Sequence, residues 1–146
     1  MNRPACPFCT LPPERVFLET GTTLAFLDAY PVAEGHAILD RLVDQDFPCY
    51  GLTNWSGETY RAAQDLMPFV RHMQYTAVSG DLKMGKPEPE IFRHLLGVIG
   101  KPAEACAFID DSPANIAAAK RLGIHAVLFK NDGSATEELR KLGVPV

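Results

Sequence analysis

The sequence predicts an α/β fold of the Rossmann-like kind, a three-layer structure in which helices cover both faces of a parallel sheet. From Leu24 onward, short apolar runs alternate with segments of helical periodicity. This alternation is typical of parallel strands that are joined by helices. Of the 146 residues, 47% are hydrophobic and 22% are charged, which suits one domain with a buried core. We expect that domain to cover residues 24–146, after an irregular or weakly extended N-terminal segment at 1–23.

The predicted strands are five short apolar runs: Leu24–Asp28, Cys49–Asn54, Tyr75–Ser79, Ala105–Asp110 and His125–Phe129. Runs of this length with turn residues around them are typical of strands that are buried on both faces. Cys49 and Cys106 lie within two of the runs, where a reduced thiol packs as a small hydrophobic side chain. The cysteines therefore favour a reducing compartment.

Helical segments separate these runs. Four apolar side chains share one face of a predicted helix at Ala37–Gln45. Ser56 can cap a second helix that runs to about His72. Pro89 suits the first turn of a third helix, because the N–H that a proline lacks would be unpaired there in any case. The remaining helices are expected from Ser112-Pro113 to Gly123, and after a capping box of Ser134 with Glu137.

Composition excludes several classes of protein. The 14 Lys+Arg and 18 Asp+Glu residues give a formal net charge of -4, and no run of basic residues is present. Binding of nucleic acid needs clustered cations, so we expect no nucleic-acid partner. No stretch approaches the roughly 20 apolar residues of a membrane helix, and the segment Met1–Pro4 does not begin a signal peptide. We expect a cytoplasmic protein with no membrane partner.

Acidic side chains follow two of the predicted strands. Asp28 ends the first strand, and Asp110 and Asp111 end the fourth. Ligands bind at the carboxyl ends of the strands in open α/β sheets. Adjacent carboxylates at this edge predict an oxygen-lined Mg²⁺ site with Asp28, Asp110 and Asp111 as ligands and water completing the octahedron. The alternative is that Asp110 and Asp111 only cap the next helix, although Ser112 already supplies a capping side chain.

Two further segments carry polar groups toward the same edge. Thr53 and Asn54 follow a buried run and can offer a hydroxyl and main-chain N–H groups to a phosphate oxygen. Lys86 stands shortly before a helix that begins with proline, where its ammonium can lean over the strand ends and offset the carboxylate charge. The alternative is an ordinary surface lysine.

Three motifs then appear in order and with matching spacing: Leu52-Thr53-Asn54-Trp55-Ser56, Lys83-Met84-Gly85-Lys86-Pro87-Glu88-Pro89 and Phe108-Ile109-Asp110-Asp111-Ser112-Pro113-Ala114-Asn115. Through them, residues 37–146 resemble the haloacid dehalogenase (HAD) superfamily of hydrolases. The resemblance implies a HAD-like fold, phosphate-binding roles for Thr53 and Asn54, and a charge-balancing, catalytic and substrate-binding role for Lys86. It implies Mg²⁺ binding by Asp110, with Asp111 beside it. No cap-sized insertion stands between Asp28 and Thr53, so we expect no cap domain.

The family's reaction uses an aspartate after the first strand as a nucleophile, which forms a covalent intermediate that water then hydrolyses. Here the segment Leu24-Ala25-Phe26-Leu27-Asp28-Ala29-Tyr30-Pro31-Val32 offers Asp28 as that nucleophile. Tyr30 stands where phosphatase members carry a second, acid/base aspartate. Dehalogenase members carry Asp-x-Tyr at this place but follow it with Gly-Thr, where this chain has Pro31-Val32.

Residues 1–36 resemble a second family, the opening of a histidine triad (HIT) nucleotide-binding protein, through Cys6-Pro7-Phe8-Cys9 and Asp28-Ala29-Tyr30-Pro31-Val32-Ala33-Glu34-Gly35-His36. Histidine triad catalysis is excluded, because its chemistry needs three closely spaced histidines. The four histidines here stand far apart and are expected at the surface or partly packed: His36, His72, His94 and His125. Cys6 and Cys9 could supply only half of a tetrahedral zinc site and no second pair follows, so we do not expect a metal there. On this interpretation the chain is a hybrid, joined near Gly35-His36.

Three functions follow from these alternatives. The first is a Mg²⁺-dependent phosphomonoester hydrolase, weakened by the missing acid/base aspartate. The second is a non-catalytic module that binds phosphate and Mg²⁺. The third is a halocarbon hydrolase that uses Asp28 and Tyr30. The expected partner is a small phosphorylated or halogenated substrate, and the oligomeric state stays open.

Overall fold

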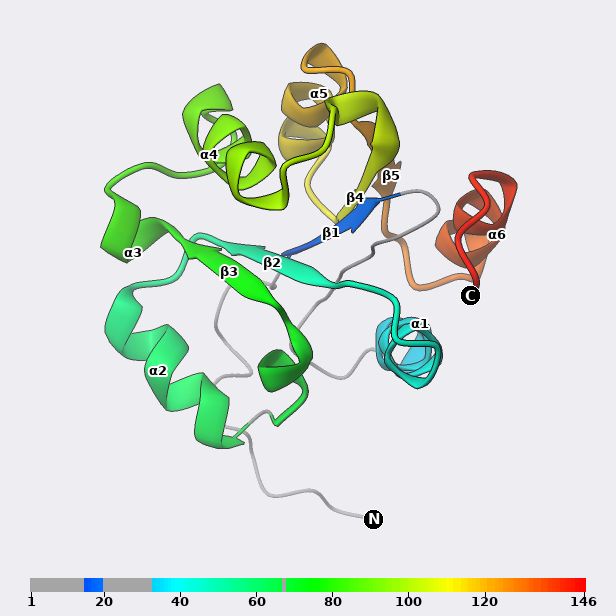
Figure 1. Cartoon of the computed structure of the whole chain (residues 1–146), viewed down its shortest axis with the longest axis horizontal. Helices are drawn as coiled ribbons and strands as arrows, with labels where there is room; N and C mark the ends of the chain where they lie inside the picture. Colours follow the sequence, from blue (N-terminus) through cyan, green and yellow to red (C-terminus); the bar gives the residue numbers. More distant parts are fainter. Residues whose placement is uncertain (1–14, 20–32, 67) are drawn as a thin grey trace.

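The computed structural model describes residues 15–19, 33–66 and 68–146 (Figure 1). Its strands are β1 (Arg15–Glu19), β2 (Tyr50–Thr53), β3 (Tyr75–Val78), β4 (Cys106–Asp110) and β5 (His125–Leu128). Its helices are α1 (Ala33–Asp44), α2 (Gly57–Leu66), α3 (Ser79–Leu82), α4 (Pro89–Ile99), α5 (Pro113–Arg121) and α6 (Ser134–Lys141), with 3₁₀ turns at Pro68–His72 and Ala103–Ala105. The α/β fold class is thereby confirmed. The strands expected at residues 49–54, 75–79, 105–110 and 125–129 are all present, with ends that shift by one residue.

The sheet differs from the prediction in the direction of its central strand. The strand order is β3-β2-β1-β4-β5. β2 pairs with β3, and β4 with β5, in parallel, whereas β1 runs antiparallel to both of its neighbours. In this register Val16 lies opposite Gly51 on one side and Ile109 on the other. The sheet is therefore mixed rather than wholly parallel, and a strand lies within the segment that was expected to be irregular or weakly extended.

β2 has β3 on one side and β1 on the other. The strand expected at Leu24–Asp28 lies outside the described residues. The strand-helix-strand unit expected from Leu24 to Asn54 therefore stays a prediction.

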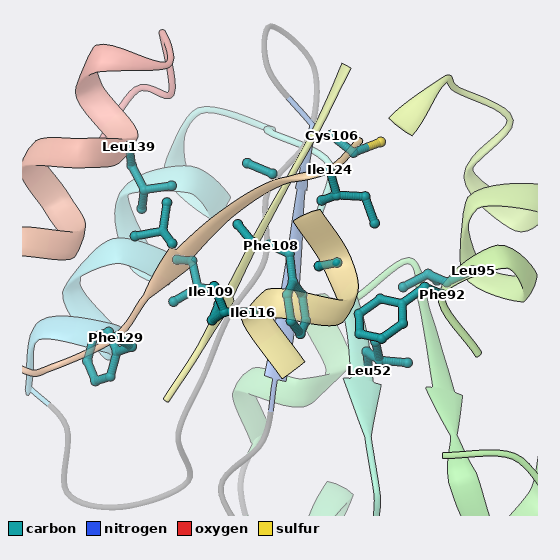
Figure 2. Packing of buried hydrophobic residues seen from close by; sticks show 14 of the residues in the cluster. Leu52, Phe92, Leu95, Cys106, Phe108, Ile109, Ile116, Ile124, Phe129 and Leu139 are labelled. Carbon is teal, nitrogen blue, oxygen red and sulfur yellow. The ribbon is translucent and has the colours of Figure 1, made fainter. Parts of the chain in front are cut away.

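Helices cover both faces of the sheet. In Figure 1, α4 and α5 lie on one face and α1 and α2 on the other, while α6 lies beside β5 and α1. The core between the upper helices and the sheet contains Phe92 and Phe108, whose rings meet edge to face with centroids 5.3 Å apart (Figure 2). On the opposite face, α1 buries Ile38, Leu39 and Leu42 completely or nearly so. Burial of this apolar area is the main driving force for docking the helices onto the sheet.

Most helix ends follow the sequence signals. Ser56 Oγ accepts a hydrogen bond from the Thr59 N–H at 3.1 Å, as a capping serine should. Pro89 begins α4. α2 ends at Leu66 rather than continuing to about His72, because Pro68 cannot supply the helical N–H and disfavours helical geometry in the residue before it.

The predicted capping box of Ser134 with Glu137 is wrong. The residue before α6 is Gly133, and no side chain caps this helix from that position. Ser134 is the first helical residue, and its main-chain N–H binds Oδ1 of Asp132 at 3.0 Å. Glu34 of α1 instead accepts hydrogen bonds from the Gly133 N–H at 3.1 Å and the Thr136 hydroxyl at 3.0 Å. The start of α6 is therefore held from a segment far away in the sequence, which local spacing does not reveal.

The cysteines and histidines that the structure describes are placed as expected. Cys49 and Cys106 are buried, free thiols. His72 and His125 are exposed, while His36 and His94 are partly buried. Cys6 and Cys9 lie outside the described residues. Within the described part of the chain, no helix is long and apolar enough to cross a membrane, and a cytoplasmic location stays a prediction.

Candidate active site

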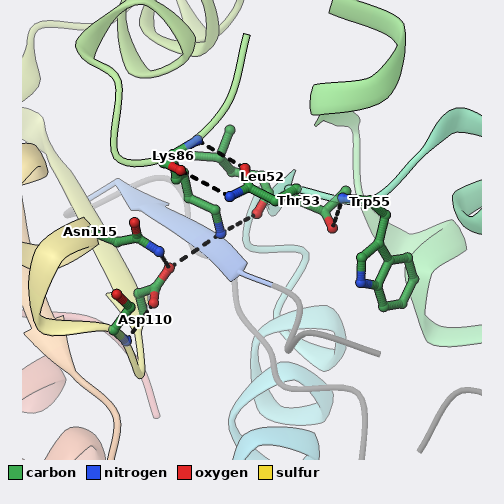
Figure 3. A network of polar contacts seen from close by, with 8 residues as sticks. Leu52, Thr53, Trp55, Lys86, Asp110 and Asn115 are labelled. Atoms are coloured by element: carbon green, nitrogen blue, oxygen red, sulfur yellow. Dashed lines mark hydrogen bonds and ion pairs between the residues drawn. The ribbon is translucent and has the colours of Figure 1, made fainter. Parts of the chain in front are cut away.

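A buried ion pair lies at the centre of the candidate site. The ammonium nitrogen of Lys86 lies 3.2 Å from Oδ2 of Asp110, and the two side chains are only 2% and 0% exposed. Lys86 Nζ also donates a hydrogen bond to the carbonyl of Leu52 at 3.0 Å and lies 5.8 Å from the centroid of the Phe108 ring. Figure 3 shows the Lys86 side chain reaching between Leu52 and Asp110. Lys86 is therefore no ordinary surface lysine, because charges so far removed from water need partners.

The topology explains why these residues meet. Thr53 ends β2 and Asp110 ends β4. Both strands run antiparallel to β1, so they run parallel to each other and their carboxyl ends share one edge of the sheet. Lys86 enters the same edge from the turn before α4, whose first residue is Pro89. The edge predicted from the sequence therefore gathers Thr53, Lys86 and Asp110.

The Asp110 carboxylate is held by both of its oxygens. Oδ1 accepts the Ser112 main-chain N–H at 2.7 Å, and Oδ2 accepts the Asn115 amide at 3.0 Å in addition to Lys86. Ser112 precedes α5 but makes no side-chain cap, so the capping role expected of Ser112 is wrong. Asn115, which is also buried, is a site residue that the sequence reasoning missed. Its place in the first turn of a helix after Asp110 was the available signal.

Asn54 contacts the main chain of Lys86 through both polar atoms of its carboxamide. Its Oδ1 accepts the Lys86 main-chain N–H at 2.8 Å, and its Nδ2 donates to the Lys86 carbonyl at 3.0 Å. The two bonds tie the end of β2 to the main chain that carries the buried lysine. The side chain of Asn54 is thus engaged with protein through both of its polar atoms, and its main chain stays a candidate for the phosphate contact expected from the sequence.

The hydroxyl group of Thr53 can donate a hydrogen bond. The residue is only 1% exposed, and its Oγ1 accepts the Trp55 main-chain N–H at 3.3 Å. A threonine hydroxyl can donate one hydrogen bond while it accepts others. The accepting role toward Trp55 therefore leaves the donating role compatible with a phosphate oxygen at this edge.

The described residues provide two carboxylates for a metal. Asp110 is held at the edge by the Ser112 N–H on Oδ1, and Asp111 next to it is exposed. Mg²⁺ is typically bound by one or two carboxylates together with water and substrate phosphate, so this donor set fits it. Among the described residues, no group of three or more His, Cys, Asp or Glu side chains gathers to hold a metal. The third predicted ligand, Asp28, lies outside them.

The predicted nucleophile is not among the residues that the structure describes, and neither is Tyr30. The strand between Thr53 and Asp110 is β1, which runs in the opposite direction. At the candidate edge β1 therefore contributes its first residues, with Arg15 opposite Leu52 in the register. No described carboxylate comes from this central strand at the edge.

A shallow depression adjoins the buried ion pair. It has a volume of about 410 Å³ and is open to solvent. Its lining residues follow β2, begin α3, or lie between α3 and α4: Asn54, Ser79, Lys83, Met84, Gly85, Lys86 and Glu88. A small molecule whose phosphate lies beside Lys86 can place its remaining part here.

Comparison with known proteins agrees with this fold. The family model for haloacid dehalogenase-like hydrolases matches residues 11–123, and the chain belongs to this family of hydrolases. The match begins at residue 11 and so includes much of the stretch that resembles a histidine triad protein. That second resemblance is not shown by the comparisons.

Two relatives carry names that describe enzymes acting on phosphate compounds. The chloroplastic flavin mononucleotide hydrolase 1 of Arabidopsis thaliana is 29% identical over 109 residues, covering 75% of this chain and 44% of the relative. The phosphoserine phosphatase of Thermus thermophilus is 32% identical over 77 residues, covering 49% of this chain and 31% of the relative. The chain thus spans less than half the length of these curated relatives.

Solved structures include both phosphate-binding and dehalogenase neighbours. A HAD family enzyme from Bacteroides thetaiotaomicron, in complex with magnesium and inorganic phosphate, is 28% identical with a TM-score of 0.58, over 66% of this chain and 51% of that one. A dehalogenase with an intermediate complex is 25% identical with a TM-score of 0.60, over 76% of this chain and 47% of that one. The kind of hydrolase is therefore not fixed by similarity alone.

Proposed function

We propose that this chain is a Mg²⁺-dependent phosphomonoester hydrolase that acts through an aspartyl intermediate on Asp28. The observation that carries the proposal is the buried Lys86–Asp110 ion pair beside the Thr53 hydroxyl at one edge of the sheet. A fixed ammonium and a hydroxyl donor at this edge suit the oxygens of a phosphate dianion. The two relatives named for phosphate compounds support the same choice.

In the proposed reaction, the substrate phosphate lies against Thr53 and Lys86, which orient it and balance its charge. The Asp28 carboxylate attacks phosphorus, the bond from phosphorus to the ester oxygen breaks, and the released alcohol takes a proton from water. A second water then hydrolyses the acyl phosphate, which releases inorganic phosphate and restores the carboxylate. Tyr30 replaces the expected acid/base aspartate, so we expect slow turnover, since positioned proton transfer contributes about 10²- to 10⁴-fold.

Asp110 and Asp111 are the described residues that would hold Mg²⁺. The ion, when bound, neutralises phosphate charge as phosphorus is attacked. Asp110 is pre-oriented for this role by Ser112, Asn115 and Lys86, which together hold both of its oxygens. Outer-shell partners of this kind fix the direction of a ligating carboxylate.

The test is hydrolysis of p-nitrophenyl phosphate by the purified chain with Mg²⁺, with EDTA, and as the Asp28→Asn variant. Asp44→Asn is the matched control, because Asp44 is exposed at the end of α1. We expect Mg²⁺-dependent turnover that EDTA and Asp28→Asn abolish and that Asp44→Asn leaves unchanged. Turnover that survives Asp28→Asn would refute the proposed nucleophile.

The direction of β1 favours a second candidate, a non-catalytic module that binds phosphate and Mg²⁺. The strand between β2 and β4 brings no described carboxylate to the edge. On this alternative, phosphate with Mg²⁺ raises the thermal midpoint through binding to the folded state, while no ester is hydrolysed. The same preparation incubated with 2-chloropropionate tests halocarbon hydrolysis, since halide release without added metal would favour the dehalogenase type.

A further inference from the structure

We propose that the depression beside Lys86 is the subsite for the leaving group, and that it takes a small zwitterionic group carrying both an ammonium and a carboxylate. This inference rests on the proposed function and names the class of substrate. Its first support is the chemistry of the lining residues. Met84 is the one apolar side chain among them; the others are polar or, at Gly85, absent.

The depression contains one cation and one anion besides Lys86. Lys83 and Glu88 are both exposed and both line it. Among the described residues, neither forms an ion pair within 4.0 Å. Two opposite charges that share a hollow without pairing can each meet the opposite charge of a bound ligand.

Main-chain hydrogen bonds orient both side chains. Lys83 Nζ donates to the carbonyl of Gly80 at 2.8 Å, which uses one of its three hydrogens. Glu88 Oε2 accepts the Gly85 N–H at 3.2 Å, which leaves Oε1 to accept elsewhere. Each charged group is thus restrained on one side and keeps hydrogen-bonding capacity on the other.

Lys86 links the depression to the proposed phosphate position, because it lines the depression and also forms the ion pair with Asp110. A Cβ atom on Gly85 would lie 2.9 Å from Ser79 Oγ and 3.2 Å from Asn54 Oδ1, so Gly85 packs closely against two other residues that line the depression. Asn54 in turn holds the main chain of Lys86. Lys83 and Glu88 line the same depression as Lys86, so the leaving group of a phosphate bound beside Lys86 can extend toward them.

The test compares four small phosphomonoesters that differ in the charge of the leaving group. O-Phosphoserine carries both charges, phosphoethanolamine only the ammonium, 2-phosphoglycolate only the carboxylate, and glycerol 3-phosphate neither. For the unaltered chain we expect kcat/KM to be highest for O-phosphoserine. The lining charges are exposed, so each matched charge is expected to contribute about two- to fivefold.

Two variants separate the charges. Lys83→Met should lower kcat/KM about two- to fivefold for the two esters that carry a carboxylate and leave the others unchanged. Glu88→Gln keeps an acceptor for the Gly85 N–H and should lower kcat/KM only for the two esters that carry an ammonium. Lys141→Met, a change at an exposed residue at the end of α6, is the control and should change none of the four values.

A uniform effect on all four esters, or no effect, would overturn the subsite. If no ester is hydrolysed, the proposed function fails, and the subsite is tested by calorimetric binding of the same four compounds. The same order of affinities, lost selectively in the two variants, would support the subsite without catalysis. Equal binding, or no binding, would overturn it.

Discussion

Removing either member of the buried ion pair should destabilise the protein, and the two removals should differ in size. Breaking a buried pair by removing one partner typically costs about 3–5 kcal/mol, because the remaining charge stays buried. Both side chains here are at most 2% exposed, so this range applies. The contacts of the remaining partner then decide which variant is worse.

After Lys86→Met, the Asp110 carboxylate keeps the Ser112 N–H at 2.7 Å and the Asn115 amide at 3.0 Å. We expect a cost near the lower end, about 3 kcal/mol. After Asp110→Asn, the introduced amide has one oxygen for three donors. Its NH₂ group must face either the Ser112 N–H or the Lys86 and Asn115 donors, which adds about 1–3 kcal/mol for unsatisfied buried groups.

The assay is urea unfolding followed by circular dichroism, for both single variants and the double variant. We expect Asp110→Asn to lower the free energy of unfolding by about 1 kcal/mol or more beyond Lys86→Met. The double variant should lose less free energy of unfolding than the sum of the two single losses, because both buried charges are removed together. A larger cost for Lys86→Met, or additive costs, would refute this account of the pair.

Three smaller perturbations test neighbouring contacts. Asn54→Ala removes both hydrogen bonds to the Lys86 main chain. Hydrogen exchange at the Lys86 amide should therefore speed up about fivefold, equivalent to about 1 kcal/mol. An unchanged exchange rate would show that these two hydrogen bonds do not hold the Lys86 main chain. Burial raises the pKa of Tyr75 above its ordinary value of 10.0. The tyrosine therefore ionises first in the unfolded chain, and the free energy of unfolding should fall as pH rises past 10. Tyr75→Phe should flatten this fall, and equal pH dependence of stability in the two proteins would count against the prediction. Gly80→Ala would place a Cβ 2.6 Å from Ser56 Cα, a main-chain clash that should cost about 1–3 kcal/mol in urea unfolding, and a neutral variant would show that the two segments can separate.

The elements that the sequence predicted well are those whose signal is local. Buried parallel strands appear as short continuous apolar runs, so β2 to β5 could be placed to within a residue at either end. Proline and serine signals placed the starts of α2 and α4 for the same reason. The family motifs then brought Thr53, Lys86 and Asp110 to one edge before any geometry was known.

The features that the sequence did not reveal depend on distant partners. The apolar run of β1, Val16-Phe17-Leu18, is short, and its antiparallel pairing with two parallel strands is set by the whole sheet. Asn54 follows a strand, which indicated a site, but its partner is the main chain of Lys86, 32 positions away. The loop before α6 is likewise held from a distance, because Glu34 accepts the Gly133 N–H.

The antiparallel direction of β1 has a mechanistic consequence. In a parallel sheet, the last residue of the strand between β2 and β4 would point from a rigid strand end into the gap between Thr53 and Asp110. Here that edge receives the beginning of β1, so the strand between them cannot deliver Asp28 in this manner. Groups that a strand does not position are held less precisely than groups on rigid elements, and a misplacement of about 1 Å can cost about 10² in rate.

Phosphate binding and turnover should respond differently to the loss of Asp28. Thr53, Lys86, Asp110 and Asn115 are buried and mutually fixed by the described part of the fold, so phosphate binding should be robust. In the proposed function, catalysis depends in addition on Asp28. We therefore expect Asp28→Asn to leave the affinity for inorganic phosphate with Mg²⁺ within about threefold while removing turnover. Loss of both together would instead show that Asp28 is part of the binding scaffold, and the division between scaffold and nucleophile would be wrong.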